Sequence, residues 1–411
     1  MPELTDHQIA HLRALKAQCV NEPFVAPGER KRTVAFCIVA VLAVLGATLW
    51  PFDPFPRNGV SWLQGTGGLK FEKAGLLISN GALEPAETQA TESYSLELLL
   101  RPASTKSAYT ILGFYAPTRP RQFLVRQWKD GLLVTHDAAV ESDRTKTIKF
   151  DVDHVFHSGR LVLVTISSGP NGTTVYLDGQ TAQSFPGFRI SRSELSGETV
   201  LGTSPVTYDP WSGELRGLAI YSKEQTPEDA FRHYEQWTDP RGRPPDLDGV
   251  LARYAFTEAV GREVRDQAAS GPNLEIPESF NVPHKGMLRS VAKEFKANRR
   301  YVIEVLMNVG GFVPLGLIVC AYVAWTRNPW KAILITTVAC GILSLVIEVL
   351  QYFIPRRGSG TTDIITNTLG AAVGAIFMER RAVGCALEQM KLIRRVRESL
   401  EHRRVPSPRF L

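Results

Sequence analysis

The sequence predicts a multidomain membrane protein: a four-span α-helical bundle with an all-β sandwich inserted between spans one and two. Three observations support this prediction. The 411 residues contain four long apolar segments, one near the start and three in the last third. The region between the first and second segments is polar and punctuated by glycine and proline. Basic residues cluster beside the apolar segments, as they do in membrane proteins.

The four apolar segments are long enough, or nearly so, to cross a hydrocarbon core of ~30 Å at ~1.5 Å per residue. They are Thr33–Trp50, Tyr301–Trp325, Ala332–Ile354 and Thr361–Met378. The first carries no charged residue and follows a polar lead too long for a typical signal peptide, so it is expected to remain as an anchor. These spans define a first membrane segment over residues 33–54 and a bundle over residues 301–378.

The distribution of lysine and arginine predicts the orientation of the spans. Basic residues precede span one, lie between spans two and three, and follow span four: Lys31, Arg32, Arg327, Lys331, Arg380, Arg381, Lys391, Arg394, Arg395 and Arg397. By the positive-inside rule, both termini are cytoplasmic, with tails over residues 1–32 and 379–411. The region between spans one and two is then extracytoplasmic. The net charge of +6 is explained by the bilayer, and no nucleic-acid partner is predicted.

A basic stretch over residues 281–300 would also lie outside. It contains Lys285, Arg289, Lys293, Lys296, Arg299 and Arg300. Apolar residues recur in it at helical spacing: Met287, Leu288, Val291 and Phe295. The pattern favours a basic amphipathic helix on the outer leaflet, with a solvated linker helix as the alternative.

Short alternating runs separated by turn residues predict that residues 59–240 form the sandwich. "SYSLELLL" places Tyr94, Leu96, Leu98 and Leu100 on one face. "TVYLDGQ" predicts a tight turn at Asp178–Gly179, and "QTPEDAFRHYEQW" predicts a helix that Thr226 caps. All five cysteines lie outside residues 51–300, so this domain is expected to fold without disulfides.

Several segments of this region, in order, resemble a known fold. "SYSLELLLRP", "YTILGFY", "GLLVT", "LVLVTISSGPNGTTVYLDG" and "WSGELRGLAIYSKEQTPEDAFRHY" look like the laminin-G-like, concanavalin A-like jelly roll of bacterial surface proteins. Residues 241–280 include a piece similar to the opening strands of such a domain. They are expected to be either closing strands of the same sandwich or a partial repeat.

The resemblance implies that the jelly roll binds glycans or protein surfaces. Trp128, Tyr208 and Trp211 are candidates to stack on sugar rings, and core packing is the alternative role. No E-x-D-x-x-E run is present, so glycan hydrolysis is not expected. No cofactor and no metal site are predicted, although Ca²⁺ at loop acids such as Asp151, Asp153 or Asp209 is conceivable without an EF-hand loop.

Each of the last three spans carries one polar and small-residue stripe at helical spacing. The stripes comprise Glu304, Asn308, Gly311, with Gly310, Pro314 and Gly316 beside them, in span two; Gly341, Ser344, Glu348 and Gln351 in span three; and Asp363, Asn367, Gly370 and Gly374 in span four. In the predicted orientation Asn308, Glu348 and Asn367 lie roughly 9 to 10 Å below the outer boundary.

Burying an unpaired charge in a bilayer costs ~2.5 to 3.5 kcal/mol, so these groups must face one another, a cavity or a ligand. One interpretation is a polar pocket that opens outward and recognises a lipid headgroup. The other is structural: Glu348 pairs with Arg356 or Arg357, and Asp363 caps span four.

The same residues carry a second resemblance. "LWPFDPFP", "NVGGFVPLG" and "SLVIEVLQYFIPRRGSGTTDIITNTLGAAVG" look like the VanZ-like family of small membrane proteins. Its pattern matches Asn308, Phe312, Pro314, Gly316, Glu348, Gln351, Arg356 or Arg357, Asp363, Asn367 and Gly370, and the two arginines leave open which fills the family role. The resemblance implies a bacterial inner-membrane protein of the cell envelope, including low-level antibiotic resistance to teicoplanin-type glycopeptides.

Three functions follow as hypotheses. The first is an envelope protein whose outer pocket, formed by Asn308, Glu348, Gln351, Arg356, Arg357, Asp363 and Asn367, engages a lipid-linked or amphiphilic molecule. The second is a membrane enzyme acting on a lipid-linked precursor, although no recognised catalytic constellation occurs. The third is a membrane-anchored, lectin-like carbohydrate binding module. The sequence does not indicate an oligomeric state.

Overall fold

A computed structural model describes residues 27–85, 92–117, 119–138, 146–239, 247–295, 297–323 and 328–380. The chain divides into two compact units. The sandwich unit is Asp53–Lys285, and the helical unit is Met1–Phe52 together with Gly286–Leu411. The predicted cytoplasmic tails fall almost entirely outside the described residues.

The sandwich unit contains two antiparallel sheets of eight strands each within the described residues. The first has the order β1-β2-β13-β4-β9-β10-β11, with β14 also paired to β13. Its strands are β1 (Val60–Trp62), β2 (Leu69–Phe71), β4 (Tyr94–Pro102), β9 (Val162–Gly169), β10 (Gly172–Leu177), β11 (Gln180–Phe185), β13 (Gly213–Tyr221) and β14 (Val250–Tyr254).

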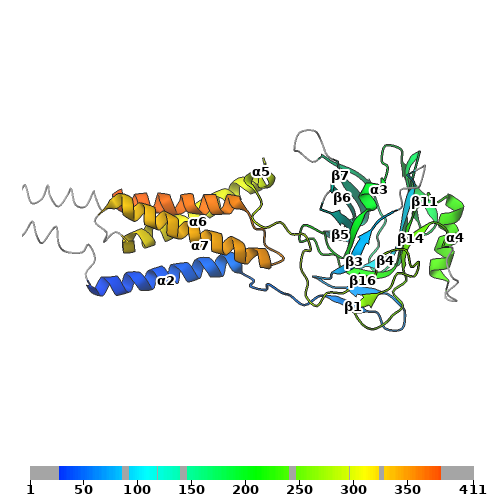
Figure 1. The fold of residues 1–411 in the computed structure, drawn as a ribbon, viewed down its shortest axis with the longest axis horizontal. Coiled ribbons are helices and arrows are strands. Elements are labelled where there is room, and N and C mark those ends of the chain that lie inside the picture. Colours follow the sequence, from blue (N-terminus) through cyan, green and yellow to red (C-terminus); the bar gives the residue numbers. More distant parts are fainter. Residues whose placement is uncertain are drawn as a thin grey trace, which may run out of the picture. The chain divides into compact units, whose positions relative to one another are not determined.

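The second sheet has the order β15-β16-β3-β12-β5-β6-β7-β8. Its strands are β3 (Leu77–Leu83), β5 (Ala108–Ala116), β6 (Arg119–Trp128), β7 (Gly131–Ala138), β8 (Lys146–Val152), β12 (Gly197–Leu201), β15 (Glu263–Val264) and β16 (Leu274–Glu275). The two sheets face each other as the layers of a sandwich (Figure 1). A short helix, α3 (Arg192–Leu195), precedes β12.

The core of the sandwich forms where apolar side chains alternate along the strands. Tyr94, Leu96, Leu98 and Leu100 of β4 all lie in the core cluster, as the alternation predicts. The turn between β10 and β11 is also confirmed. Asp178 and Gly179 both adopt positive φ, of 50° and 77°, which suits a two-residue hairpin.

The helix predicted after β13 is α4 (Pro227–Thr238). Thr226 is its N-cap, and the Asp229 backbone N–H donates to the Thr226 hydroxyl at 3.2 Å. The helix covers the outer face of the first sheet (Figure 1), where Glu97 of β4 bonds to His233. This explains why β4 is buried on both faces, since its outward residues lie under α4.

The strands after residue 247 complete the same sandwich. β14 pairs with β13 in the first sheet, and β16 pairs with β3 in the second. One short segment therefore extends both layers, which favours closing strands over a partial repeat.

The helical unit contains α2 (Pro27–Leu49), α5 (Val291–Glu294), α6 (Arg299–Val323), α7 (Pro329–Phe353) and a helix over residues 361–380. Within the described residues, three helical stretches are long and apolar enough to cross a membrane: Lys31–Leu49, α6 and α7. The fourth predicted span, Thr361–Met378, lies within the helix over residues 361–380, which is not one of these three stretches, and it stays a prediction. Side chains of α2 pack with those of α6 and α7 in one cluster.

The basic segment over residues 281–300 differs from the predicted amphipathic helix. Among the described residues of this segment, the four residues of α5 are helical before α6 begins at Arg299. The backbone around Arg289 instead forms a parallel bridge to Gly360. These longer-range hydrogen bonds hold the chain extended, so the helical spacing of the apolar residues does not produce a long helix.

Candidate functional site

Glycines let the helix over residues 361–380 approach α6 closely. A Cβ added at Gly370 would lie 2.2 Å from the Val309 carbonyl oxygen, and one at Gly374 would lie 2.2 Å from that of Val313. Gly316 of α6 approaches the backbone of Ala371 in the same way. Side chains larger than hydrogen would separate the helices, so these small residues bring the polar stripes together.

The first polar contact across this interface joins α6 to the start of the last helix. The Asn308 side-chain amide donates to Asp363 Oδ1 at 2.8 Å. Glu348 of α7 is 1% exposed, and its carboxylate accepts a hydrogen bond from the Gly360 N–H at 2.7 Å. Glu348 and Asp363 also contact each other through their side chains. Asn308, Glu348 and Asp363 therefore form one polar cluster.

Asn367 belongs to a separate pair. Its side-chain amide donates to Ser344 Oγ of α7 at 2.9 Å, and the residue is 5% exposed. The three residues predicted to lie at one depth therefore make two separate sets of contacts. Asn308 and Glu348 belong to the polar cluster, and Asn367 pairs with Ser344. Asp363, rather than Asn367, is the partner of Asn308.

Two of the predicted polar residues reach the end of α2. The Gln351 amide donates to the Thr48 carbonyl at 2.9 Å, and the Arg357 guanidinium donates to the Trp50 carbonyl. These carbonyls end a helix and lack partners within it. Gln351 and Arg357 therefore join α2 to the other helices.

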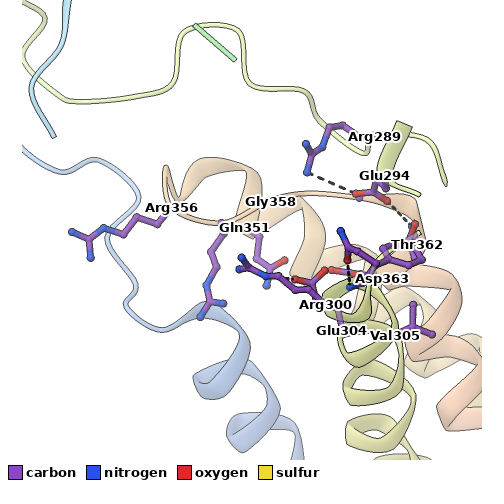
Figure 2. Close-up of a pocket in the computed structure, with 14 residues that line it drawn as sticks. Arg289, Glu294, Arg300, Glu304, Val305, Gln351, Arg356, Gly358, Thr362 and Asp363 are labelled. Carbon is purple, nitrogen blue, oxygen red and sulfur yellow. Dashed lines mark hydrogen bonds and ion pairs between the residues drawn. The ribbon is translucent and has the colours of Figure 1, made fainter. Parts of the chain in front are cut away.

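A cavity of about 650 Å³ opens beside this cluster, and we call it the polar cavity. Its lining combines charged side chains from α6, the loop after α7, the start of the last helix and the segment before α6 with the neutral Gln351 of α7 (Figure 2). The lining residues are Arg289, Glu294, Asn298, Arg300, Tyr301, Glu304, Val305, Gln351, Arg356, Arg357, Gly358, Gly360, Thr362 and Asp363.

Sequence reasoning placed Glu304, Gln351, Arg356, Arg357 and Asp363 near such a pocket, and all five line it. Glu304 forms an ion pair with Arg300 at 3.4 Å, one helical turn away. Glu348 and Asn308 are not among the lining residues. Asn308 contacts the lining residue Asp363, and Glu348 contacts the lining residues Asp363 and Gly360.

The sequence pattern did not indicate that residues 289–301 contribute to this site. Arg289, Glu294, Asn298 and Arg300 line the cavity, although the pattern suggested a helix on the membrane surface. The signal that could have located them is the unusual run of basic residues next to a span on the predicted outer side.

The three aromatic candidates in the sandwich unit have different environments. Trp211 is 1% exposed and packs against Phe71, and its indole N–H donates to Gln127 Oε1 at 2.8 Å. A side chain buried in this way cannot stack on a sugar at the surface. Tyr208 is partly buried and packs edge-on against Phe280. Trp128 is 53% exposed and remains a stacking candidate.

A second cavity, of about 370 Å³, lies in the sandwich unit. Tyr115 stacks on the His284 ring at 3.7 Å between centroids, and His284 forms an ion pair with Glu198. The lining of this cavity comprises Ala82, Glu84, Tyr115, Ala116, Pro117, Arg192, Ser196, Gly197, Glu198 and His284. The sequence had not indicated this site, because its residues come from distant strands.

One of the conceivable calcium ligands, Asp209, already has side-chain partners in the structure. Asp209 accepts hydrogen bonds from Arg126 at 2.8 Å and from the Thr110 hydroxyl at 2.6 Å. Asp151 and Asp153 are exposed. Among the described residues, no group of three or more histidine, cysteine, aspartate or glutamate side chains is arranged to hold a metal ion.

Comparisons with known proteins match both units. Residues 253–381 match the model of the VanZ/LLP1 family, and residues 78–230 match that of the concanavalin A-like lectin/glucanases superfamily. The apolar helices and the sandwich therefore define a membrane protein with a lectin-like domain. In particular, the chain combines a VanZ-like region with a laminin-G-like, concanavalin A-like jelly roll. The VanZ/LLP1 match begins at the end of β14, includes β15 and β16, and excludes α2.

Solved structures show weaker likeness. A candidate carbohydrate binding protein from Bacteroides ovatus is 13% identical with a TM-score of 0.35, over 56% of this chain and 62% of its own. The receptor binding domain of botulinum neurotoxin D is 18% identical with a TM-score of 0.32, over 43% and 45%. A heptameric pentraxin from Limulus polyphemus is 15% identical with a TM-score of 0.31, over 54% and 93%.

The chain therefore spans less than two thirds of the first two structures. All three TM-scores lie below 0.5, so these likenesses carry no functional argument. The comparison with curated proteins gave no match.

Proposed function

We propose that the helical unit binds the polar headgroup of a lipid-linked or amphiphilic envelope molecule in the polar cavity. The observation that carries this proposal is a charged cavity of about 650 Å³ beside the start of one apolar helix, α6, and the end of another, α7. On α6, next to the lining residue Val305, the side chains of Val302, Leu306 and Met307 are 54%, 63% and 70% exposed. An amphiphile would place its headgroup in the cavity and its chains along this apolar face.

The proposal includes an orientation. The helices cross a bacterial inner membrane as four spans with both termini in the cytoplasm, and the sandwich unit lies outside. The polar cavity then opens at the outer leaflet, where lipid-linked envelope precursors are used. The positive-inside distribution of basic residues supports this orientation.

The experiment compares the lipids that remain bound to purified protein. Full-length wild type and Asp363→Asn are extracted from bacterial membranes in detergent, and bound molecules are measured by native mass spectrometry. We expect one amphiphile per wild-type chain and a severalfold lower occupancy in Asp363→Asn, because the new amide would place an N–H donor against the Asn308 amide and disturb the contact that shapes this side of the lining. Asp153→Asn, which changes an exposed carboxylate of the sandwich unit, is the matched control.

Equal occupancy in all three proteins would contradict the proposal. A fall in occupancy that merely follows a fall in folded protein would support a structural role for Asp363. Monodispersity and thermal stability of each variant separate these results.

A role in glycopeptide resistance extends this proposal. If the cavity acts in that role, expression of the wild type raises the teicoplanin concentration that a sensitive bacterium survives. Asp363→Asn should abolish the increase at equal membrane abundance.

A second candidate function is ligand binding by the sandwich unit. The 370 Å³ cavity with Tyr115 at its wall favours it, since an aromatic face and nearby carboxylates can bind a sugar ring and its hydroxyls. A glycan array probed with the full-length protein tests this function. Binding that Tyr115→Ala removes and Trp128→Ala preserves would assign it to the cavity, and the reverse result would assign it to Trp128.

A further inference from the structure

Residues 286–295 pass over the loop between α7 and the last helix, and we call them the strap. The Arg289 N–H donates to the Ser359 carbonyl at 3.1 Å, and the Thr361 N–H donates to the Arg289 carbonyl at 2.9 Å. The Leu288 N–H also donates to Ser359 Oγ at 3.3 Å. These bonds pair the strap with the loop and fix the position of α5.

The strap brings Glu294 to the start of the helix over residues 361–380. Glu294 Oε2 accepts a hydrogen bond from the Thr362 N–H at 3.1 Å, and the side chain is 14% exposed. A Cβ added at Gly360 would lie 1.7 Å from Glu294 Oε1, so only glycine admits the carboxylate here. The first N–H groups of a helix lack partners within it and attract anions. Glu294 therefore occupies an anion position.

The groups around the Glu294 carboxylate can bind more negative charge than this carboxylate carries. Arg289 Nη2 lies 3.9 Å from Glu294 Oε1, which is a loose ion pair (Figure 2). The Thr362 hydroxyl is buried, the residue is 8% exposed, and its Oγ1 makes no hydrogen bond to a described residue. The described lining of the cavity has four arginines and three carboxylates, and Glu294 is one of the three. A buried hydroxyl without a partner costs free energy that a ligand oxygen would recover.

We propose that the polar cavity takes a phosphate group and that Glu294 is an internal substitute which this phosphate displaces from the Thr362 N–H. This inference rests on the proposed function and adds the chemical class of the headgroup. A phosphate has several oxygens, which can accept from the backbone N–H, the Thr362 hydroxyl and Arg289 together. The cavity leaves room for the remainder of a larger headgroup. Two anions cannot share this position, so binding moves Glu294 away and releases its contact with the helix.

The test measures the affinity of the full-length protein in detergent for three probes by isothermal titration calorimetry. Dihexanoyl phosphatidic acid presents a phosphomonoester on a lipid, inorganic phosphate presents the group alone, and dihexanoyl phosphatidylcholine is the zwitterionic comparison. We expect Glu294→Gln to bind phosphatidic acid about tenfold more tightly than the wild type, because glutamine keeps the shape and removes the competing charge. Thr362→Val should weaken binding about threefold to tenfold.

Glu304→Gln is the matched control. It removes an equal charge from the same cavity without touching the helix start, so its affinity should rise by less than threefold. A gain equal to that of Glu294→Gln, or no gain in Glu294→Gln, would overturn the displacement. If inorganic phosphate binds as tightly as phosphatidic acid, the phosphate site holds and its source is the free ion.

Different results would reject the phosphate site and the proposed binding of an amphiphile. Equal binding of phosphatidylcholine and phosphatidic acid, unchanged in Glu294→Gln, would leave amphiphile binding standing and reject the phosphate site. Absence of binding by both lipids in every variant would reject the proposed function itself.

Discussion

The carboxylate of Glu97 lies buried between β4 and α4, within hydrogen-bond distance of three side chains. His233 Nδ1 is 2.6 Å away, and the Tyr221 hydroxyl and the Trp237 indole N–H each donate at 2.9 Å. Arg253 stacks on the Trp237 ring at 4.5 Å, and burial lowers the pKa of this guanidinium. One acceptor thus holds the helix on the sheet. The sequence did not indicate this cluster, whose contacts join α4 to β4 and β13.

We therefore expect Glu97→Gln to lower the free energy of unfolding by about 2 to 4 kcal/mol. Glutamine keeps the volume, but its amide nitrogen would face donors that need an acceptor. Urea unfolding followed by tryptophan fluorescence measures the change. Glu275→Gln, an exposed substitution in β16, should stay within about 0.5 kcal/mol. Equal losses in both variants would show that Glu97 contributes no more than a surface carboxylate.

At the same scale, aromatic residues show what sequence can and cannot predict. Trp128 and Trp211 both follow short polar segments, yet one is exposed and the other is core. Trp211 packs against Phe71, and its indole N–H donates to Gln127; both contacts join residues far apart in the sequence, which no local pattern encodes. The sequence pattern identified both tryptophans as stacking candidates but did not predict which one is exposed and which one is buried.

Among the elements, the packing of α6 on the last helix depends on particular glycines. We expect Gly370→Ala to destabilise the helical unit by about 1 to 3 kcal/mol, because its methyl group would meet the Val309 carbonyl. The matched control is Gly310→Ala, since a Cβ at Gly310 meets nothing within 4 Å. That change should be neutral or stabilise the helix by up to about 1 kcal/mol. Thermal unfolding of the two variants in detergent gives the comparison, and a loss of stability in Gly310→Ala alone would refute it.

Local patterns predicted several elements well. The alternation in β4, the Asp178–Gly179 turn and the Thr226 cap each follow from residues close together in sequence. The strap could not be predicted in this way. Its pairing with Gly360 joins residues 71 positions apart, and the spacing of its apolar residues suggested a helix. Contacts of this length are set by the tertiary structure, which overrides local helical periodicity.

The candidate site shows the same limit. The stripe pattern correctly selected Asp363 and Gln351, because helical spacing determines which face each occupies. It did not determine which partner each side chain meets. Gln351 contacts the carbonyl at the end of α2, and Asn308 contacts Asp363 instead of Asn367. The helical rotation and approach that decide these pairs depend on Gly316, Gly370 and Gly374.

For the whole molecule, the predicted membrane topology can be tested by cysteine labelling. A maleimide that does not cross membranes should label Glu275→Cys in intact spheroplasts, because the sandwich unit is expected outside. The wild type is the control, since all its cysteines lie in segments predicted to be membrane or cytoplasmic. It should be labelled only after lysis. If the wild type is labelled in intact spheroplasts and Glu275→Cys shows no additional labelling, the orientation is the opposite of the predicted one.

Photo-crosslinking in living cells, from a benzophenone amino acid placed at Val305, shows whether the polar cavity holds the headgroup of a particular amphiphile. Val305 lines the cavity, whereas Leu334 of α7 does not and is 63% exposed. We predict that position 305 captures one discrete amphiphile by mass spectrometry and that position 334 captures only bulk phospholipid. The same bulk phospholipid at both positions would contradict such binding.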